Sequence, residues 1–168
     1  MKVSIITVSF NSAKTIAETI ESVLSQDFPD IEYIVVDGGS TDGTVDIIRE
    51  NENRISRWIS ERDQGMYDAM NKGIAMASGE VIGILNSDDT YMNAHVITDL
   101  MQVMQVQNTE VVFADLILVD PIKQNKVIRY YDSGRFHPNK FKYGWMPAHP
   151  TVFVTVSYTH LRAHETLR

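Results

Sequence analysis

Two adjacent carboxylates, Asp88 and Asp89, follow an apolar run at residues 81–85, in the segment Asn86-Ser87-Asp88-Asp89. Like charges at the end of a buried strand repel each other unless water or a cation offsets the repulsion. Mg²⁺ or Mn²⁺ suits such a position, because hard cations take few protein carboxylates and complete their coordination with phosphate oxygens and water. The segment therefore predicts a divalent-metal site that also binds a diphosphate. A loop followed by a capped helix is the structural alternative.

Asp37 stands where the apolar run at residues 31–36 meets the turn-rich sequence GGSTDG. Its carboxylate could accept hydrogen bonds from a base or a ribose, and the two glycines would allow a ligand to approach the backbone closely. The alternative is a turn in which Thr41 or Asp42 caps the next helix. A P-loop is excluded, because no GK[ST] sequence follows.

A third polar segment, SERDQGMYDAMNKG, gathers Glu61, Asp63 and Asp68 around Gly65. These acids could line a ligand pocket at a strand end. The structural alternative is a solvated helix start, because acidic residues are favoured in the first turn of a helix.

The segment GWMPAHP contains an aromatic residue and a histidine outside any metal-ligand spacing. His149 could contact a phosphate or an acceptor sugar, although a loop histidine is more often structural. Trp145, with Tyr143, could stack on a sugar ring, and packing within the protein is the alternative.

Apolar runs alternate with amphipathic segments over the first hundred residues, which predicts an α/β fold with a mostly parallel central sheet flanked by helices. The predicted strands are residues 3–8, 31–36, 55–59 and 81–85, and the later helices are residues 67–77 and 95–106. Ligands of such sheets bind beyond the carboxyl ends of the strands. The loops that hold Asn11, Asp37, Asp88 and Asp89 should therefore converge at one edge.

Beyond residue 110 the pattern is mixed, with strands predicted at residues 111–119 and 127–131 around a turn at Asp120 and a last β-branched run at residues 151–156. No repeat or linker interrupts the chain, and 168 residues are typical of one domain. We therefore expect a single domain.

Composition narrows the class of protein. A formal charge of −7 argues against a nucleic-acid-binding protein, which normally has a basic surface. The absence of cysteine excludes thiolate metal sites and agrees with a cytoplasmic location. The short apolar run at the N-terminus predicts a first strand rather than a signal peptide or a membrane span.

The segments SIITVSFN, IVVDGGSTDGT, SERDQGMYDAMNKGI, GILNSDD and GWMPAHPTVF, in this order and spacing, resemble the family 2 glycosyltransferases of the GT-A fold. The resemblance covers residues 1 to about 154 and extends to bacterial enzymes that build O-antigen or exopolysaccharide. It implies a Rossmann-like GT-A domain at residues 1–155. That domain would transfer a sugar, with inversion, from a UDP-sugar donor to a saccharide acceptor.

The resemblance also implies roles for individual residues. Ser9 and Asn11 would lie in the first nucleotide loop, Asp37 would contact the uracil or ribose, and Asp63 would line the nucleotide pocket. A lipid-linked oligosaccharide acceptor would bring the protein to the inner face of the membrane as a peripheral protein. Trp145 and His149 would then be candidates for acceptor or phosphate contacts.

In the same comparison the NSDD segment replaces the DXD motif of the family, with Asn86 in place of the first aspartate. Asp88 would bind the Mn²⁺ or Mg²⁺ cofactor, Asp89 would assist, and Ser87 would complete the nucleotide-sugar loop. The loss of one carboxylate predicts weaker cation binding than in relatives with two.

The C-terminal tail VSYTHLRAHETLR departs from the family pattern, in which an acidic motif downstream supplies the catalytic base. We expect residues 156–168 to be foreign to the protein, so that Glu165, the only acid of the tail, is not the base. No catalytic base is identified. The alternatives are a catalytically inactive nucleotide-sugar-binding fragment and, ranked lower, a metal-dependent nucleotidyltransferase.

Overall fold

The computed structural model describes residues 1–120, 123 and 126–156. Its strands are β1 (Val3–Ser9), β2 (Ile31–Asp37), β3 (Arg57–Ser60), β4 (Val81–Asn86), β5 (Val111–Val112), β6 (Leu116–Val119), β7 (Val127–Tyr131) and β8 (Phe153–Thr155). The helices are α1 (Ile16–Leu24), α2 (Thr44–Glu50), α3 (Met66–Met76) and α4 (Val96–Gln107). Three short 3₁₀ helices follow: η1 (Ser133–Arg135), η2 (Pro138–Tyr143) and η3 (His149–Thr151).

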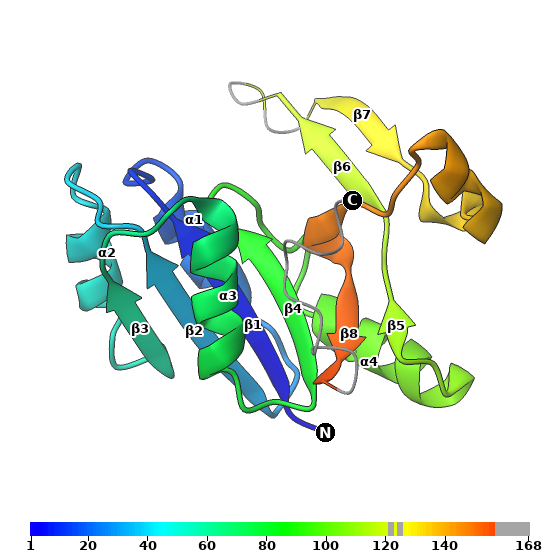
Figure 1. Cartoon of the computed structure of the whole chain (residues 1–168), viewed down its shortest axis with the longest axis horizontal. Coiled ribbons are helices and arrows are strands. Elements are labelled where there is room, and N and C mark those ends of the chain that lie inside the picture. Colours follow the sequence, from blue (N-terminus) through cyan, green and yellow to red (C-terminus); the bar gives the residue numbers. More distant parts are fainter. Residues whose placement is uncertain (121–122, 124–125, 157–168) are drawn as a thin grey trace.

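A six-stranded sheet with the order β3-β2-β1-β4-β8-β5 forms the centre of the molecule (Figure 1). Strands β3, β2, β1 and β4 are parallel to one another, and β8 runs antiparallel to β4 and β5. This arrangement confirms the predicted α/β class with a mostly parallel central sheet. Because the four parallel strands point the same way, the loops that follow them all leave from one edge.

Two apolar layers cover the sheet, because successive side chains of a strand point to opposite faces. Ile5 on β1 packs with Ile16 and Ile20 of α1, together with residues of α2 and α4. Ile6, the next residue of β1, packs on the other face with residues of α3, the helix that lies in front of the sheet in Figure 1. Gly73 of α3 lies so close to Ile6 that an added Cβ would be 2.4 Å from its Cγ2. Glycine is therefore required at this helix–sheet contact.

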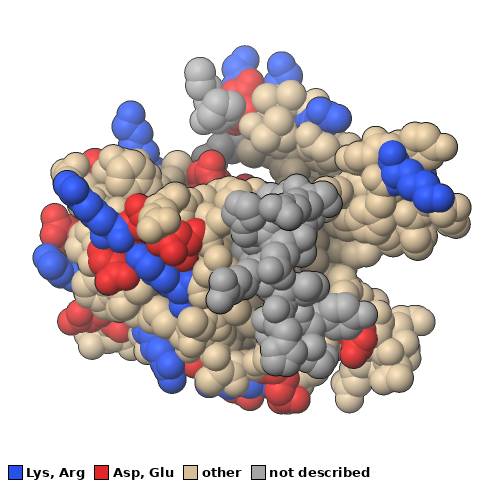
Figure 2. Space-filling model, viewed as in Figure 1, with Lys and Arg blue, Asp and Glu red and all other residues tan. Residues whose placement is uncertain are grey.

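The segment predicted as one strand at residues 111–119 is two strands in different sheets, so that prediction is wrong. Strand β5 pairs with β8 in the main sheet, whereas β6 pairs with β7 in a separate two-stranded sheet. Between them Phe113 turns toward Phe136, with ring centroids 5.0 Å apart in an edge-to-face contact. In space-filling view the β6–β7 region forms a lobe that projects beside the main body (Figure 2).

Other strand boundaries differ slightly from the predicted ones. Strand β3 begins at Arg57 rather than at residue 55, because the Ile55 N–H still donates to the Asn51 carbonyl in a helical turn. The last strand is limited to Phe153–Thr155. The N-cap of α2 is Gly43, without a side-chain cap, so the alternative in which Thr41 or Asp42 caps this helix is wrong. Asp42 precedes the cap, and its carboxylate accepts a hydrogen bond from the Thr44 N–H at 3.1 Å.

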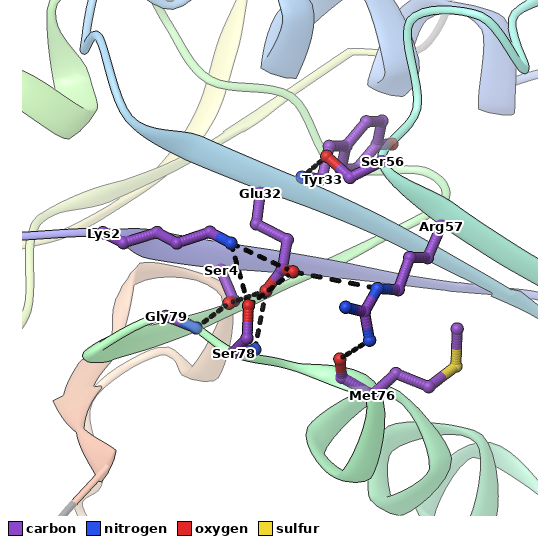
Figure 3. Close-up of polar contacts among 9 residues, drawn as sticks. All are labelled: Lys2, Ser4, Glu32, Tyr33, Ser56, Arg57, Met76, Ser78 and Gly79. Carbon is purple, nitrogen blue, oxygen red and sulfur yellow. Dashed lines mark hydrogen bonds and ion pairs between the residues drawn. The ribbon is translucent and has the colours of Figure 1, made fainter.

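A buried carboxylate joins the first residues of the parallel strands at the amino edge of the sheet (Figure 3). Glu32 of β2 is 4% exposed and accepts hydrogen bonds from the Ser4 hydroxyl at 2.6 Å and the Ser78 N–H at 2.7 Å. The Lys2 ammonium lies 3.3 Å from the same carboxylate and Arg57 Nε lies 3.9 Å away. Burial raises the pKa of Glu32, but these hydrogen bonds outweigh it and lower the pKa to about 2.

No helix of the described residues is long and apolar enough to cross a membrane. Glu165 and the rest of residues 157–168 lie outside the described part of the chain. The domain boundary predicted at residue 156 therefore stays a prediction.

Candidate functional site at the carboxyl edge of the sheet

Asp37 is the centre of the carboxyl edge. The strand register places Ser9 of β1 and Ser60 of β3 directly beside it on either side. The Ser9 hydroxyl donates to Asp37 Oδ1 at 3.0 Å, and the Ser60 hydroxyl donates to Oδ2 at 2.7 Å. The side chain of Asp37 is fully buried. Three strand ends thus meet at one carboxylate.

The loop after β2 folds back over the same carboxylate. The N–H groups of Gly39 and Ser40 donate to Asp37 Oδ2 at 3.0 and 2.9 Å, and the Ser40 hydroxyl donates to Oδ1. Gly39 has a φ of +84°, which favours glycine. Burial raises the pKa of Asp37, but the hydrogen bonds from Ser40, Ser60 and Ser9 outweigh it and leave the pKa below its usual range. Asp37 is therefore an anion at neutral pH.

The loop after β1 is fastened to the loop after β2. Asn11 has a left-handed φ of 51°; its N–H donates to the Ser40 hydroxyl at 2.7 Å, and its Oδ1 accepts from the Thr41 N–H at 3.0 Å. The next residue, Ser12, has its hydroxyl 2.7 Å from that of Ser87. The first loop therefore connects Asp37's loop to the NSDD segment.

Asp63 approaches Asp37's loop from the other side. A Cβ at Gly38 would lie 2.6 Å from Asp63 Oδ2, so glycine leaves the space that the carboxylate occupies. Asp63 Oδ1 accepts from the Gly65 N–H at 2.9 Å, just before α3. Asp63 is half-buried at the rim of the loop cluster.

The NSDD segment leads from the end of β4 into a polar chain. Asn86 Nδ2 donates to Asp89 Oδ2 at 2.9 Å and lies 3.0 Å from His149 Nε2. Burial and the nearby charge of Asp88 raise the pKa of Asp89. Asn86 Oδ1 is buried without a hydrogen-bond partner among the described residues. His149 reaches this position because η3 precedes β8, the neighbour of β4 in the sheet.

Asp88 differs from Asp37, Asp63 and Asp89 because its side chain is exposed. In the described part of the chain no Lys or Arg forms an ion pair with Asp37, Asp88 or Asp89. The same residues contain no group of three His, Cys, Asp or Glu side chains placed to hold a metal ion alone. A divalent cation bound through Asp88, and at most Asp89, would therefore need ligand phosphates and water to fill its coordination, as Mg²⁺ commonly does.

Trp145 lies in an aromatic cluster outside this polar network. Its ring centroid is 5.4 Å from that of Phe136, and Lys140 Nζ lies 5.9 Å from the Trp145 centroid. Trp145 also lines a small open pocket together with Tyr131 and Asp132. The chain connects it to His149 through the three intervening residues.

The structure thus brings most of the predicted residues together through the loops after β1, β2 and β4. Ser9 contacts Asp37 directly, and Asn11 reaches the same loop. Ser87 contacts Ser12, the residue after Asn11, whereas Asn86 contacts Asp89 and His149. The sequence interpretation missed Ser60, although it ends a strand and the strand-end rule could have found it. It also missed Ser40 and Ser12, whose contacts depend on loop conformation.

Comparison with known proteins agrees with this geometry. The model of the family "Glycosyl transferase family 2" matches residues 4–160. The chain therefore belongs to glycosyl transferase family 2.

Individual relatives are bacterial glycosyltransferases. An uncharacterized glycosyltransferase of Mycobacterium tuberculosis is 41% identical over 103 residues, which are 61% of this chain and 39% of the relative. Glycosyltransferase GlyG of Streptococcus pneumoniae is 34% identical over 116 residues, covering 67% of this chain and 38% of that protein. The chain thus spans about two fifths of the length of the curated relatives it matches.

Among solved structures, Staphylococcus aureus TarS in complex with UDP-GlcNAc is 30% identical, with a TM-score of 0.61 over 67% of this chain and 34% of TarS. The mannosyltransferase PcManGT from Pyrobaculum calidifontis, solved with GDP-Man and Mn²⁺, is 24% identical, with a TM-score of 0.62 over 72% of this chain and 36% of that one. The second likeness supports the GT-A fold alone.

Proposed function

We propose that the carboxyl edge binds the UDP moiety of a nucleotide-sugar donor, and that the protein is an inverting glycosyltransferase. The main support is that the loop after β1 contacts both Asp37's loop after β2 and the NSDD segment after β4, in which Asp88 is exposed. Parallel α/β sheets bind ligands at this edge. TarS, which is similar over two thirds of this chain, was solved with UDP-GlcNAc.

In the proposed complex, Asn11, Ser9 and Asp37 shape the base and ribose side of the pocket, and Asp63 closes its rim. The carboxylate of Asp37 already accepts five hydrogen bonds from protein groups. Its proposed role is therefore to hold the glycine-rich loop in the conformation that presents backbone groups to the nucleotide.

The residues of the NSDD segment fit a divalent cation. Asp88, with Asp89 assisting, would hold Mn²⁺ or Mg²⁺, and Asn86 and Ser87 would line the diphosphate. When bound, the cation would stabilise negative charge on the departing diphosphate. Asn86 supports this arrangement by holding Asp89 turned away from solvent, which leaves Asp88 as the exposed ligand.

The acceptor is proposed to be a saccharide, carried on a lipid in surface-polysaccharide synthesis, which attacks the anomeric carbon in a single displacement. Trp145 and His149 are the proposed contacts on the acceptor or phosphate side. His149 is suited to this position because it lies 3.0 Å from Asn86 and is exposed. A positioned imidazole can donate to a phosphate oxygen or a hydroxyl.

Calorimetric titration of UDP, once with Mn²⁺ and once with chelator, tests the donor site. We expect binding with the cation and much weaker binding with chelator. Equal affinity in both conditions would contradict the metal assignment. If the folded chain binds no UDP at all, the nucleotide assignment fails.

Asp88→Ala is the matched substitution for this test. It should weaken Mn²⁺-dependent UDP binding by at least about 100-fold, because loss of a residue that only supports a metal ligand already costs up to about that much, with the melting temperature unchanged because Asp88 is exposed. Asp46→Ala is the control, since Asp46 is an exposed aspartate on α2 whose contact is a surface ion pair with Arg49. Manganese dependence that survives in Asp88→Ala would overturn the assignment.

A further inference from the structure

Exposed apolar side chains concentrate in one part of the molecule. Among the described residues, seven large apolar side chains are exposed in residues 1–110 and ten in the much shorter segment 111–156. Eight of the ten lie on the projecting lobe, which we define as residues 116–119 and 126–146: Leu118, Val127, Ile128, Tyr130, Tyr131, Phe141, Tyr143 and Met146. Contiguous exposed apolar surface commonly marks an interaction site.

The lobe is shaped to present these side chains. All five residues of β7 are exposed, and within the described residues β7 pairs with β6 alone. Ile128 is 56% exposed and Tyr143, at the end of η2, is 87% exposed. An isolated two-stranded ribbon gains little stability from such side chains, so folding of the lobe does not account for them.

The charge of the chain is divided along the same boundary. Residues 1–110 hold seven Lys or Arg and 18 Asp or Glu, a formal charge of −11. Residues 111–156 hold six Lys or Arg and three Asp, a formal charge of +3. Lys126, Arg129 and Lys142 are exposed on the lobe. Figure 2 shows Lys and Arg side chains spread over the lobe, with few acidic ones beside them.

Basic residues interleaved with exposed Tyr, Ile and Val favour an anionic membrane over another protein as the partner of the lobe. Protein–protein interfaces are depleted in lysine, whereas anionic membrane surfaces attract Lys and Arg and accept Tyr and Trp rings at the headgroup level. The Arg129 guanidinium lies 4.4 Å from the Tyr131 ring centroid, which holds a cation and an aromatic ring together at this surface. The acidic body would be repelled by the same membrane, so the lobe would set the orientation.

We propose that the projecting lobe docks on an anionic phospholipid surface. The lobe leads through Pro147 and Ala148 to His149 at the proposed donor site. Docking through it would therefore hold the acceptor side of the site against the bilayer. The biological purpose of this docking rests on the proposed function, because a lipid-linked acceptor would be embedded in that bilayer. Binding of the lobe to lipid can be measured without reference to sugar transfer.

The experiment is flotation of the whole chain with vesicles of one-third phosphatidylglycerol and two-thirds phosphatidylcholine, compared with phosphatidylcholine alone. We expect binding to the anionic vesicles and its loss in high salt, because surface charge interactions are screened. Lys126→Gln/Arg129→Gln should weaken binding about 30-fold, since each basic residue near such a surface contributes about fivefold. Ile128→Thr/Tyr143→Ser should also weaken it, while the fold remains intact by circular dichroism.

Lys14→Gln/Arg49→Gln is the matched control, because it removes one Lys and one Arg from the acidic body. It should bind vesicles like the unmodified protein. An equal loss in this control, or no flotation of the unmodified protein, would overturn the proposal. So would a dimer in sedimentation equilibrium that Ile128→Thr/Tyr143→Ser dissociates, since the lobe would then pair with a second copy. UDP titration of each variant separates failure of docking from failure of the donor site.

Discussion

Strand β2 has a buried carboxylate at each end, and the two carboxylates have different kinds of partner. Glu32 at the amino edge is contacted by serine groups and by the ammonium of Lys2 at 3.3 Å. Asp37 at the carboxyl edge is contacted by serine hydroxyls and backbone N–H groups, and none of the described ion pairs includes it. Asp88 and Asp89 add further negative charge nearby. The protein thus neutralises its amino edge internally, whereas at the carboxyl edge the proposed function assigns that role to a cation and a nucleotide bound from outside.

Glu32→Gln should have the largest effect and should change stability alone. Its depressed pKa corresponds to about 3 kcal/mol of stability at pH 7 that the neutral amide lacks. Urea denaturation measures this loss, and the affinity for Mn²⁺–UDP should not change. The control is Glu80→Gln at the same edge, which is 69% exposed and should cost less than about 0.5 kcal/mol.

The effect of Glu32→Gln on stability should depend on pH. Because the folded-state pKa of Glu32 is below its usual value of 4.5, its stabilisation is complete above that pH and disappears as the pH falls toward about 2. The stability difference between the unmodified protein and Glu32→Gln should therefore shrink over this interval. A constant difference would show that lost packing, rather than charge, causes the effect.

Asp37→Asn should cost about 2 kcal/mol and should also impair UDP binding. The amide nitrogen cannot accept the hydrogen bonds that one carboxylate oxygen accepts, so donors such as the Gly39 N–H lose their partner. Denaturation and calorimetry on one sample measure both effects. If UDP affinity is unchanged in a destabilised Asp37→Asn protein, Asp37 has a purely structural role like that of Glu32, and the two ends of β2 do not differ in function.

Asn86→Asp should change the stability by a smaller amount, and the sign of this change should depend on whether the cation is present. The new carboxylate would stand about where the amide now lies, 2.9 Å from Asp89, and mutual repulsion should cost about 1 kcal/mol in chelator. Mn²⁺ should restore the melting temperature beyond its effect on the unmodified protein. Asn93→Asp, which adds a charge at an exposed position, is the control and should show no such recovery.

Gly38→Ala should have the smallest effect on stability, below about 1 kcal/mol, because the new Cβ meets the movable end of the Asp63 side chain. Displacement of that carboxylate should still lower UDP affinity several-fold. Calorimetry of this variant beside Asp63→Asn would separate the position of the carboxylate from its charge. Unchanged affinity in both variants would remove Asp63 from the proposed site.

Much of the carboxyl edge could be predicted because the signals are local. Each apolar run ends at a polar residue, and parallel strands place those ends together, so the loops that hold Asn11, Asp37, Asp88 and Asp89 were expected at one edge. Glu32 was not predicted, because it interrupts an apolar run as an isolated acid. Its serine and lysine partners come from two distant segments, residues 2–4 and residue 78.

The sequence by itself determined the α/β class, the order of the parallel-strand segments and the identity of the polar loops, since apolar periodicity and turn residues act over a few positions. Tertiary structure decided which of these groups meet. The Ser9–Asp37–Ser60 row depends on strand register, and the Asn86–His149 contact depends on β8 entering the sheet beside β4. The division of residues 111–119 between two sheets depends on which distant strands pair with each half. Such pairings join residues far apart in the chain, and local sequence patterns do not specify them.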